Sequence, residues 1–209
     1  MMERIFVFKN LFKSLTSVVL LVAVAQAQAD TSADALVRQI SVEVIETAKT
    51  DKAIQGGDLA RISALVEGKV MPHVNFEVVT RSAVGPQWRT ATPEQRAKLQ
   101  AEFKTLLVRV YAGAISQLRD QTVEVTKTLP VPGGTQVVVQ TEVRGKGEPI
   151  KLDYRLDKPA QDWKIIDVNV GGLWLVQNYR SQFAQELGKG GIDGLITTLA
   201  ERNKNAGKS

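Results

Sequence analysis

Few side chains in this sequence have both the type and the setting that chemistry requires. His73 is the only histidine, and the chain has no cysteine. A catalytic histidine needs an activated partner within hydrogen-bond reach, and histidine metal sites draw on a cluster of ligands. The sequence shows neither for His73, so we interpret it as a structural or surface residue. The lack of cysteine excludes thiol chemistry and thiolate metal sites.

Asp167 is the exception among the carboxylates, because it lies inside the apolar strand-like segment KIIDVNV. In a pocket shared with Tyr154, its pKa would be raised and it could act as a general base. Strand alternation argues against that position. With Ile166 and Val168 facing inward, Asp167 and Asn169 face outward. The sequence therefore favours a non-catalytic Asp167.

The glycine clusters do not form a phosphate-binding motif. Gly171-Gly172 and the segment Gly188–Gly191 match neither GxGxxG spacing nor a P-loop, since the Lys-Ser/Thr pair is absent. We interpret both clusters as helix boundaries. An anion could still meet the free amide groups of a helix N-terminus. The helix expected to start near Leu173 is the candidate, with Arg180 two turns further on.

Two arginines lie within otherwise apolar helical surfaces. Arg180 shares a short helix with Tyr179 and Phe183, and Arg109 lies close to Tyr111. A bare buried guanidinium is very unfavourable, so each arginine must reach water, a carboxylate, or the anionic group of a ligand at a pocket mouth. The apolar stripes themselves fit either an ordinary core or the wall of a pocket.

The first 29 residues are typical of a cleaved export signal. A basic start precedes the apolar run Leu15–Val24, and Ala27-Gln28-Ala29 is a small-x-small cleavage site. The run is about half of the roughly 20 residues that a membrane span requires, so a retained anchor is the less favoured alternative. With no cysteine after the run, a lipoprotein anchor is excluded.

Removal of residues 1–29 leaves 180 residues, which suits one domain with a substantial core. The remaining 24 basic and 21 acidic side chains give a net charge of +3. That excess is too small and scattered to indicate nucleic-acid binding, although it favours approach to an anionic membrane surface or an acidic partner. We predict a single domain over residues 30–204 and a disordered tail over 205–209. Without disulfides, packing alone must hold the fold.

Apolar residues at helical spacing predict a helix over Ala33–Thr50, and Asp58 is placed to cap a second one. A third short segment runs from Pro72 to Gly85. Thr92-Pro93-Glu94-Gln95 has the features of a capping box, and the long helix that it opens should run to about Arg119. Helices over Leu173–Leu187 and Gly194–Asn203, the latter capped by Asp193, close the chain.

Between the helices the period changes to two. Four segments read as strands, and short turn-like sequences separate them, which favours an antiparallel meander. The segments are Thr122–Leu129, Thr135–Val143, Pro149–Leu156 and Trp163–Val170. We therefore predict an α+β fold in which helices pack on one face of a curved, mainly antiparallel, four-stranded sheet.

At this level of detail the chain resembles the MlaC family of periplasmic phospholipid-binding proteins, also called toluene-tolerance auxiliary proteins. Two segments carry most of the resemblance, Val70–Ile115 and Trp163–Leu195. The first contains GPxWR-x-ATPEQ at the start of the long helix, and the second ends in GGIDGL. Each motif alone is weak, but their order and spacing together are specific.

The resemblance implies a deep apolar pocket for acyl chains between the sheet and the helices. It also implies a monomeric periplasmic carrier with no cofactor, whose cargo is phospholipid and which does no chemistry on it. Such proteins exchange lipid with an inner-membrane ABC transporter complex and an outer-membrane lipoprotein–porin complex, which maintains outer-membrane lipid asymmetry. Nucleic acid and metal have no part in this role.

Within the matching segments, the inward-facing residues are the expected pocket lining, and Arg109 and Arg180 are the expected mouth or headgroup residues. The expected lining comprises Phe76, Trp88, Phe103, Leu107, Tyr111, Val137, Val139, Leu152, Tyr154, Val168, Val170, Leu173, Val176, Tyr179 and Phe183. Two positions depart from what the resemblance leads us to expect. Asn75 stands in place of an acidic residue, and Trp174 in place of a small one, which would narrow the pocket.

Two other classes of function remain open at this stage. A cone-shaped α+β enzyme of the ketosteroid-isomerase type would use the same pocket with Asp167 or His73 as the base. A periplasmic chaperone or adaptor would have a filled core and no ligand. Neither Asp167 nor His73 is well placed for catalysis, which favours the carrier.

Overall fold

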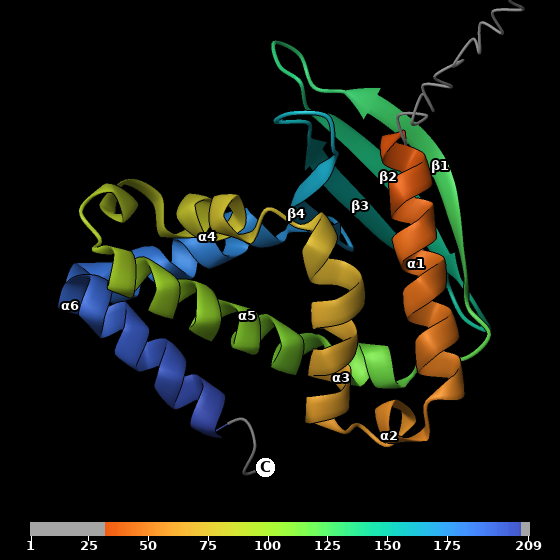
Figure 1. Ribbon diagram of the computed structural model, residues 1–209, viewed down its shortest axis with the longest axis horizontal. Coiled ribbons are helices and arrows are strands. Elements are labelled where there is room, and N and C mark those ends of the chain that lie inside the picture. The colour runs from red at the N-terminus through yellow and green to blue at the C-terminus, as the bar shows by residue number, and fades with distance from the viewer. Residues whose placement is uncertain (1–31, 206–209) are drawn as a thin grey trace, which may run out of the picture.

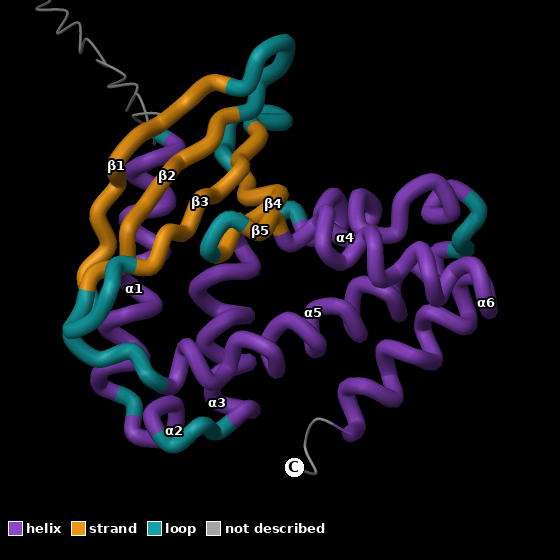
Figure 2. The backbone as a smooth tube through the Cα atoms, turned by 180° about the vertical axis from the view of Figure 1, so that it is seen from behind, coloured by secondary structure: helices purple, strands orange, loops and turns teal. Residues whose placement is uncertain are grey.

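The computed structural model describes residues 32–205. The export signal expected over residues 1–29 lies outside the described residues, as do residues 206–209 of the expected tail. Figure 1 shows two regions: a sheet with α1 lying along it, and a helical layer in which α4, α5 and α6 pack together. The same division is visible from behind in Figure 2.

The described elements combine helices and strands in an α+β fold, with short connections between them. In order they are α1 (Ala33–Thr50), α2 (Lys52–Gln55), α3 (Leu59–Leu65), the π-helix η1 (Val66–Val70), the 3₁₀ turn η2 (Met71–His73), α4 (Phe76–Val84), the 3₁₀ turn η3 (Gly85–Arg89), α5 (Pro93–Ser116), β1 (Thr122–Pro130), β2 (Val137–Arg144), β3 (Ile150–Asp157), β4 (Lys164–Val170), β5 (Leu173–Trp174) and α6 (Leu175–Asn205).

Side-chain caps set where several helices begin. Asp58 caps α3 and Asn75 caps α4, each accepting a hydrogen bond from an amide three residues on, at 3.0 and 3.2 Å. At α5 the capping box is complete. Thr92 Oγ1 accepts from the Gln95 amide at 3.2 Å, and Gln95 Oε1 accepts from the Thr92 amide at 3.0 Å. These contacts satisfy amides that have no partner within the helix.

The long helix ends slightly earlier than its sequence predicts. α5 stops at Ser116 rather than near Arg119. Arg119 lies beyond the helix, and its guanidinium donates to the carbonyl oxygens of Ser116 and Leu118, both at 2.7 Å. A basic side chain that satisfies the last carbonyls is a common way to end a helix.

The sheet has five antiparallel strands in sequence order, so the prediction of four is wrong by one. The first four strands match the predicted segments within two residues at each end. The extra strand is β5, where a helix start is expected. Gly171 and Gly172 have φ of +59° and +94°, a conformation that glycine adopts readily. This turn folds the chain back, so that Leu173 pairs with Val170 and Trp174 with Asn169.

One face of the open sheet is covered by α1. Leu36, Val37 and Ile40 on α1 pack against Val139 of β2 and Leu156 of β3, and all five are buried. Tyr154 of β3 packs against the same cluster, and Leu152 and Tyr154 line the space beside α1, whereas Ile150 at the start of the strand is 55% exposed.

The helical layer has its own core, centred on Phe103 of α5. Its ring lies 4.9 Å from Tyr179 and 5.1 Å from Phe183, both in edge-on contact, and 5.8 Å from Phe76. Tyr179 and Phe183 belong to α6, which bends where Gly191 departs from helical geometry (φ 61°, ψ −156°). The two C-terminal helices expected from the sequence therefore form one run with a break at Gly191. Asp193, expected to cap the second of them, accepts a hydrogen bond from Gln95 at 2.8 Å.

The two regions meet at β4. Val74, just before α4, forms an isolated parallel bridge with Ile165, and the Asn75 amide donates to the Ile165 carbonyl oxygen at 3.0 Å. β4 thus pairs with β3 on one side and holds the start of α4 on the other.

We expect Thr92→Ala to lower the free energy of unfolding by about 1 kcal/mol, because the N-terminus of α5 loses its cap. Urea unfolding followed by circular dichroism measures the change. Thr105→Ala is the control: the Thr105 hydroxyl only bonds back to the Ala101 carbonyl within α5, at 2.9 Å. It should change stability by no more than about 0.5 kcal/mol. Equal effects of the two variants would contradict the capping role.

Candidate functional site: an apolar cavity between sheet and helices

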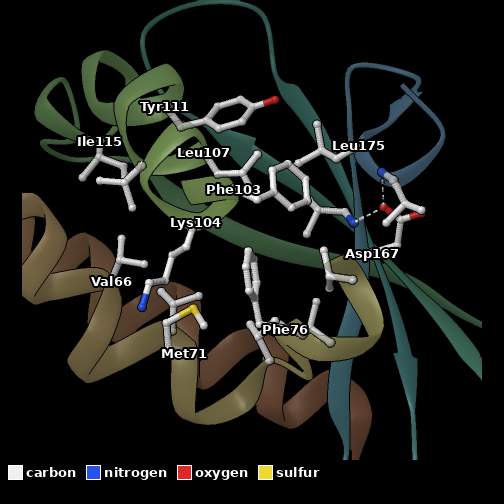
Figure 3. Close-up of a pocket in the computed structure, with 17 residues that line it drawn as sticks. Val66, Met71, Phe76, Phe103, Lys104, Leu107, Tyr111, Ile115, Asp167 and Leu175 are labelled. Carbon is white, nitrogen blue, oxygen red and sulfur yellow. Dashed lines mark hydrogen bonds between the residues drawn. The ribbon is translucent and has the colours of Figure 1, made fainter. Parts of the chain in front are cut away.

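A cavity of about 240 Å³ lies where the helical layer meets β4 (Figure 3). Its wall is almost entirely apolar, and only Lys104 and Asp167 carry a charge. The lining residues are Val66, Val70, Met71, Val74, Phe76, Val79, Phe103, Lys104, Leu107, Val108, Tyr111, Ile115, Ile165, Asp167, Val168, Leu175 and Val176. An apolar cavity of roughly 150 Å³ can stay dry and bind benzene, so this one favours an apolar occupant over water.

Helix α5 supplies one side of the cavity. Phe103, Leu107, Tyr111 and Ile115 recur at spacings of four, with Lys104 and Val108 beside them, so they share one face of the helix. Gly113 and Ala114, between the lining residues Tyr111 and Ile115, are both exposed and do not line the cavity. The capping box at Thr92 starts this helix and thereby sets which face meets the cavity.

A second cavity of about 220 Å³ lies between α1 and the sheet. It shares Val70, Val74, Ile165 and Val168 with the first, so these four residues form a common wall. Its lining residues are Ile40, Ser41, Val44, Ile45, Val70, Val74, Leu118, Val123, Val143, Leu152, Tyr154, Ile165 and Val168. The two cavities therefore flank the Val74–Ile165 bridge.

The tyrosine hydroxyls in these cavities stay neutral. Burial raises the pKa of Tyr111 above the ordinary value for a phenol. Burial also raises the pKa of Tyr154, against a smaller lowering by its hydrogen bond with the Ser41 side chain. Both phenols can therefore donate hydrogen bonds, and neither adds charge to the cavity.

The structure brings eight of the expected lining residues to the two cavities. Phe76, Phe103, Leu107, Tyr111, Val168 and Val176 line the first, and Leu152, Tyr154 and Val168 line the second.

The other expected residues line neither cavity. Trp88, Tyr179 and Phe183 are packed in the core of the helical layer, while Val137 and Val139 pack beneath α1. Val170 and Leu173 flank the glycine turn, where Leu173 is 53% exposed. These residues follow the predicted apolar pattern, but the pattern does not separate a filled core from a cavity wall.

The expectation that Asp167 and Asn169 face outward into solvent is wrong, since both are buried. β5 pairs with the edge of β4, and the start of α6 lies against this part of the strand. Asp167 Oδ1 accepts hydrogen bonds from the amides of Val168 at 2.9 Å and Val176 at 3.0 Å. Figure 3 shows the carboxylate at the edge of the cavity. Burial raises the pKa of Asp167, partly offset by these amides and by Arg155.

The two arginines expected at a pocket mouth lie elsewhere. Arg109 is two residues from Leu107 and from Tyr111, which puts it on the other side of α5. Arg180 is exposed, and its guanidinium lies beside Gly85 at the end of α4. The charged residue that does line the first cavity from α5 is Lys104, three residues before Leu107. Helical spacing from the predicted lining residues Leu107 and Tyr111 would have identified it.

The two positions that depart from the resemblance have structural explanations. Asn75 caps α4, a role that an acidic residue would also fill. The ring of Trp174 lies outside the lining of both cavities and stacks on Arg155, whose guanidinium carbon is 4.4 Å from the ring centroid. Trp174 therefore does not narrow either cavity.

No group of three or more potential metal ligands occurs among residues 32–205. His73 lies in η2 and lines neither cavity. Within the same part of the chain, no helix has the length and hydropathy needed to cross a membrane.

Comparison with known proteins identifies the family and the fold. Residues 38–201, from α1 into α6, match the family model described as MlaC protein. The chain belongs to the MlaC family. The match includes every element that lines the two cavities.

Two of the three relatives below have names that refer to phospholipid. The intermembrane phospholipid transport system binding protein MlaC of Haemophilus influenzae is 23% identical over 84% of each chain. The toluene tolerance protein ttg2D of Pseudomonas putida is 26% identical over 66% of this chain and 67% of its own. A phospholipid-binding protein from Ralstonia solanacearum, solved in complex with a phospholipid, is 41% identical with a TM-score of 0.81 and covers 84% of this chain and 99% of its own.

The buried carboxylate predicts a pH dependence of stability. Because the folded pKa of Asp167 is raised, its contribution to stability is complete below the unfolded value of about 3.9. That contribution is lost as the pH rises through the folded pKa. Asp167→Asn keeps an oxygen acceptor and cannot ionise, so its stability relative to the wild type should increase across this window. Urea midpoints measured between pH 4 and pH 7 test the trend.

Asp167→Ala is the matched variant, because it leaves the part-buried Val176 amide without its acceptor. It should destabilise the protein by about 1–3 kcal/mol at every pH in that range. A flat difference between wild type and Asp167→Asn would show that burial does not perturb this carboxyl.

Proposed function

We propose that this protein is a periplasmic carrier that encloses phospholipid acyl chains in its apolar cavities. The observation that carries the proposal is the 240 Å³ cavity with an almost wholly apolar lining, in a chain 41% identical to a protein solved with phospholipid. A core with no ligand would fill such a space with side chains, because unfilled volume is destabilising. This favours the carrier over an adaptor with a filled core.

Acyl chains supply the binding energy that this lining can use. Burying each CH₂ group contributes about 0.8 kcal/mol, so a 16-carbon chain contributes on the order of 10 kcal/mol before ordering costs. An apolar wall cannot distinguish headgroups by hydrogen bonds, so most of the affinity resides in the chains.

We propose no chemistry on the lipid. Asp167 lines the cavity and its pKa is raised, which are two features of a general base. Its Oδ1, however, accepts two backbone amide hydrogen bonds and holds the start of α6. Among the described residues that line the cavity, no histidine or second carboxylate accompanies it. These contacts favour a structural role over the ketosteroid-isomerase type of catalysis.

The carrier role implies export and two docking partners. The N-terminal 29 residues have the pattern of an export signal, and the family resemblance supplies the partners. We propose that the monomer exchanges lipid with an inner-membrane ABC transporter complex and an outer-membrane lipoprotein–porin complex. Transfer at either end then maintains the lipid asymmetry of the outer membrane.

Leu107→Trp should fill the first cavity and abolish phospholipid occupancy while the protein stays folded. Leu107 lines the cavity from the middle of α5, and the larger ring takes up space that an acyl chain needs. Native mass spectrometry of protein purified from its own periplasm measures the occupancy, and circular dichroism checks the fold.

Val110→Trp is the matched control, since Val110 lies on the same helix and is 54% exposed. It should keep the wild-type lipid occupancy. Wild-type protein that carries no lipid, and takes none up from vesicles, would overturn the carrier proposal.

A further inference from the structure

Lys104 is the one residue of the cavity wall that an acyl-chain site does not explain. It is the only cation among the residues that line the first cavity. The other lining residues on α5 carry no charge that could pair with it. Burying an ammonium group without a partner is very unfavourable, so its position implies a polar contact at the edge of the cavity.

The contact that Lys104 makes lies at the solvent-exposed edge. Its ammonium group forms an ion pair with Glu67 of η1, and the two side chains are 32% and 48% exposed. In Figure 3 the side chain extends from α5 toward Val66 and Met71, away from Asp167. The (CH₂)₄ stem thus lines apolar surface while the charge reaches water. This edge is where a lipid whose chains fill the cavity would leave a polar headgroup.

Neither of the other charged groups that bear on the first cavity suits an anion. Asp167 is a carboxylate, and its Oδ1 is already engaged with the Val168 and Val176 amides. Glu67 is also acidic and is held by Lys104. A phosphodiester at this edge would therefore meet Lys104 as its cation.

We propose that Lys104 recognises the phosphodiester of the bound lipid and that Glu67 takes its place when the site is empty. This inference rests on the proposed function, because the acyl chains must bring the phosphate to the edge of the cavity. An ion pair as exposed as Lys104–Glu67 is weak and easily exchanged. An ammonium has three donors, so it can turn to a phosphate oxygen without leaving the rim.

The test compares two lipids that differ only in the headgroup. Dioleoylphosphatidylglycerol carries the phosphodiester, and dioleoylglycerol has the same chains without it. Binding of each from vesicles by the signal-cleaved protein is measured as an equilibrium affinity. Lys104→Met keeps the apolar stem and should weaken phosphatidylglycerol binding about tenfold, as for loss of one charged hydrogen bond. Its affinity for dioleoylglycerol should be unchanged.

Three further variants make the result specific. Lys104→Arg should keep most of the phosphatidylglycerol affinity, and Glu67→Gln should raise it about two- to threefold, because the competing carboxylate is gone. Lys98→Met removes the same charge from an exposed position on α5 and should have no effect. Should Lys104→Met prove unstable, Glu67→Gln and Lys104→Arg still decide the question.

Three results would overturn the inference. Two concern Lys104→Met: equal loss of affinity for both lipids, or no loss for either. The third is displacement of bound phosphatidylglycerol by inorganic phosphate alone, which would indicate a free-phosphate site. Failure of the wild-type protein to bind either lipid would instead refute the carrier proposal itself. The failures of the two proposals are therefore distinguishable.

Discussion

The contact between the chain at Val74–Asn75 and Ile165 is the one on which the site depends. β4 is the last long strand of the sheet, and its outer edge is where the helical layer attaches. The bridge and the 3.0 Å hydrogen bond from Asn75 bring the start of α4 alongside Ile165. Asn75 also caps α4, so one residue sets both where that helix begins and which strand it touches. The residues on either side of this contact then enclose the two cavities.

Holding cavities open is costly, and the aromatic core of the helical layer offsets that cost. Phe103 belongs to both the aromatic core and the cavity wall. Its ring packs on Tyr179 and Phe183, and it also lines the first cavity. Ring contacts of this kind stabilise by about 0.5–1.5 kcal/mol beyond the area that they bury. The capped start of α5 adds to this. From this helix Leu107 and Tyr111 line the cavity, and Leu107 also packs against the same aromatic core.

Local signals in the sequence were enough to predict most of the elements. The Thr92–Gln95 capping box, the Asp58 cap and the period-two segments each act within a few residues, and the structure confirms them. Asp167 shows where such signals fail. Alternation assigns it to the open face of a sheet, but after the turn at Gly171-Gly172 the chain returns through β5 and brings the start of α6 against Asp167. Burial here results from contacts between segments, which a strand pattern does not contain.

The cavity wall was harder to predict than the fold for the same reason. Phe183 and Phe103 have the same apolar character and similar spacing, yet Phe183 packs wholly into the core while Phe103 also meets the cavity. Only the distance between neighbouring elements decides whether such a residue is packed in the core or lines a cavity. Arg109 and Lys104 differ likewise: both are cations on α5, and the helical turn alone determines which of them reaches the cavity.

The common wall of Val70, Val74, Ile165 and Val168 couples the shapes of the two compartments. A larger side chain at Ile165 would shrink both spaces together, and a smaller one would join them into a single chamber. Positions such as Leu107 or Leu152 border one compartment alone and can change its width without touching the other. Substitutions at the four shared residues thus alter both compartments together, whereas substitutions at unshared residues alter one compartment alone.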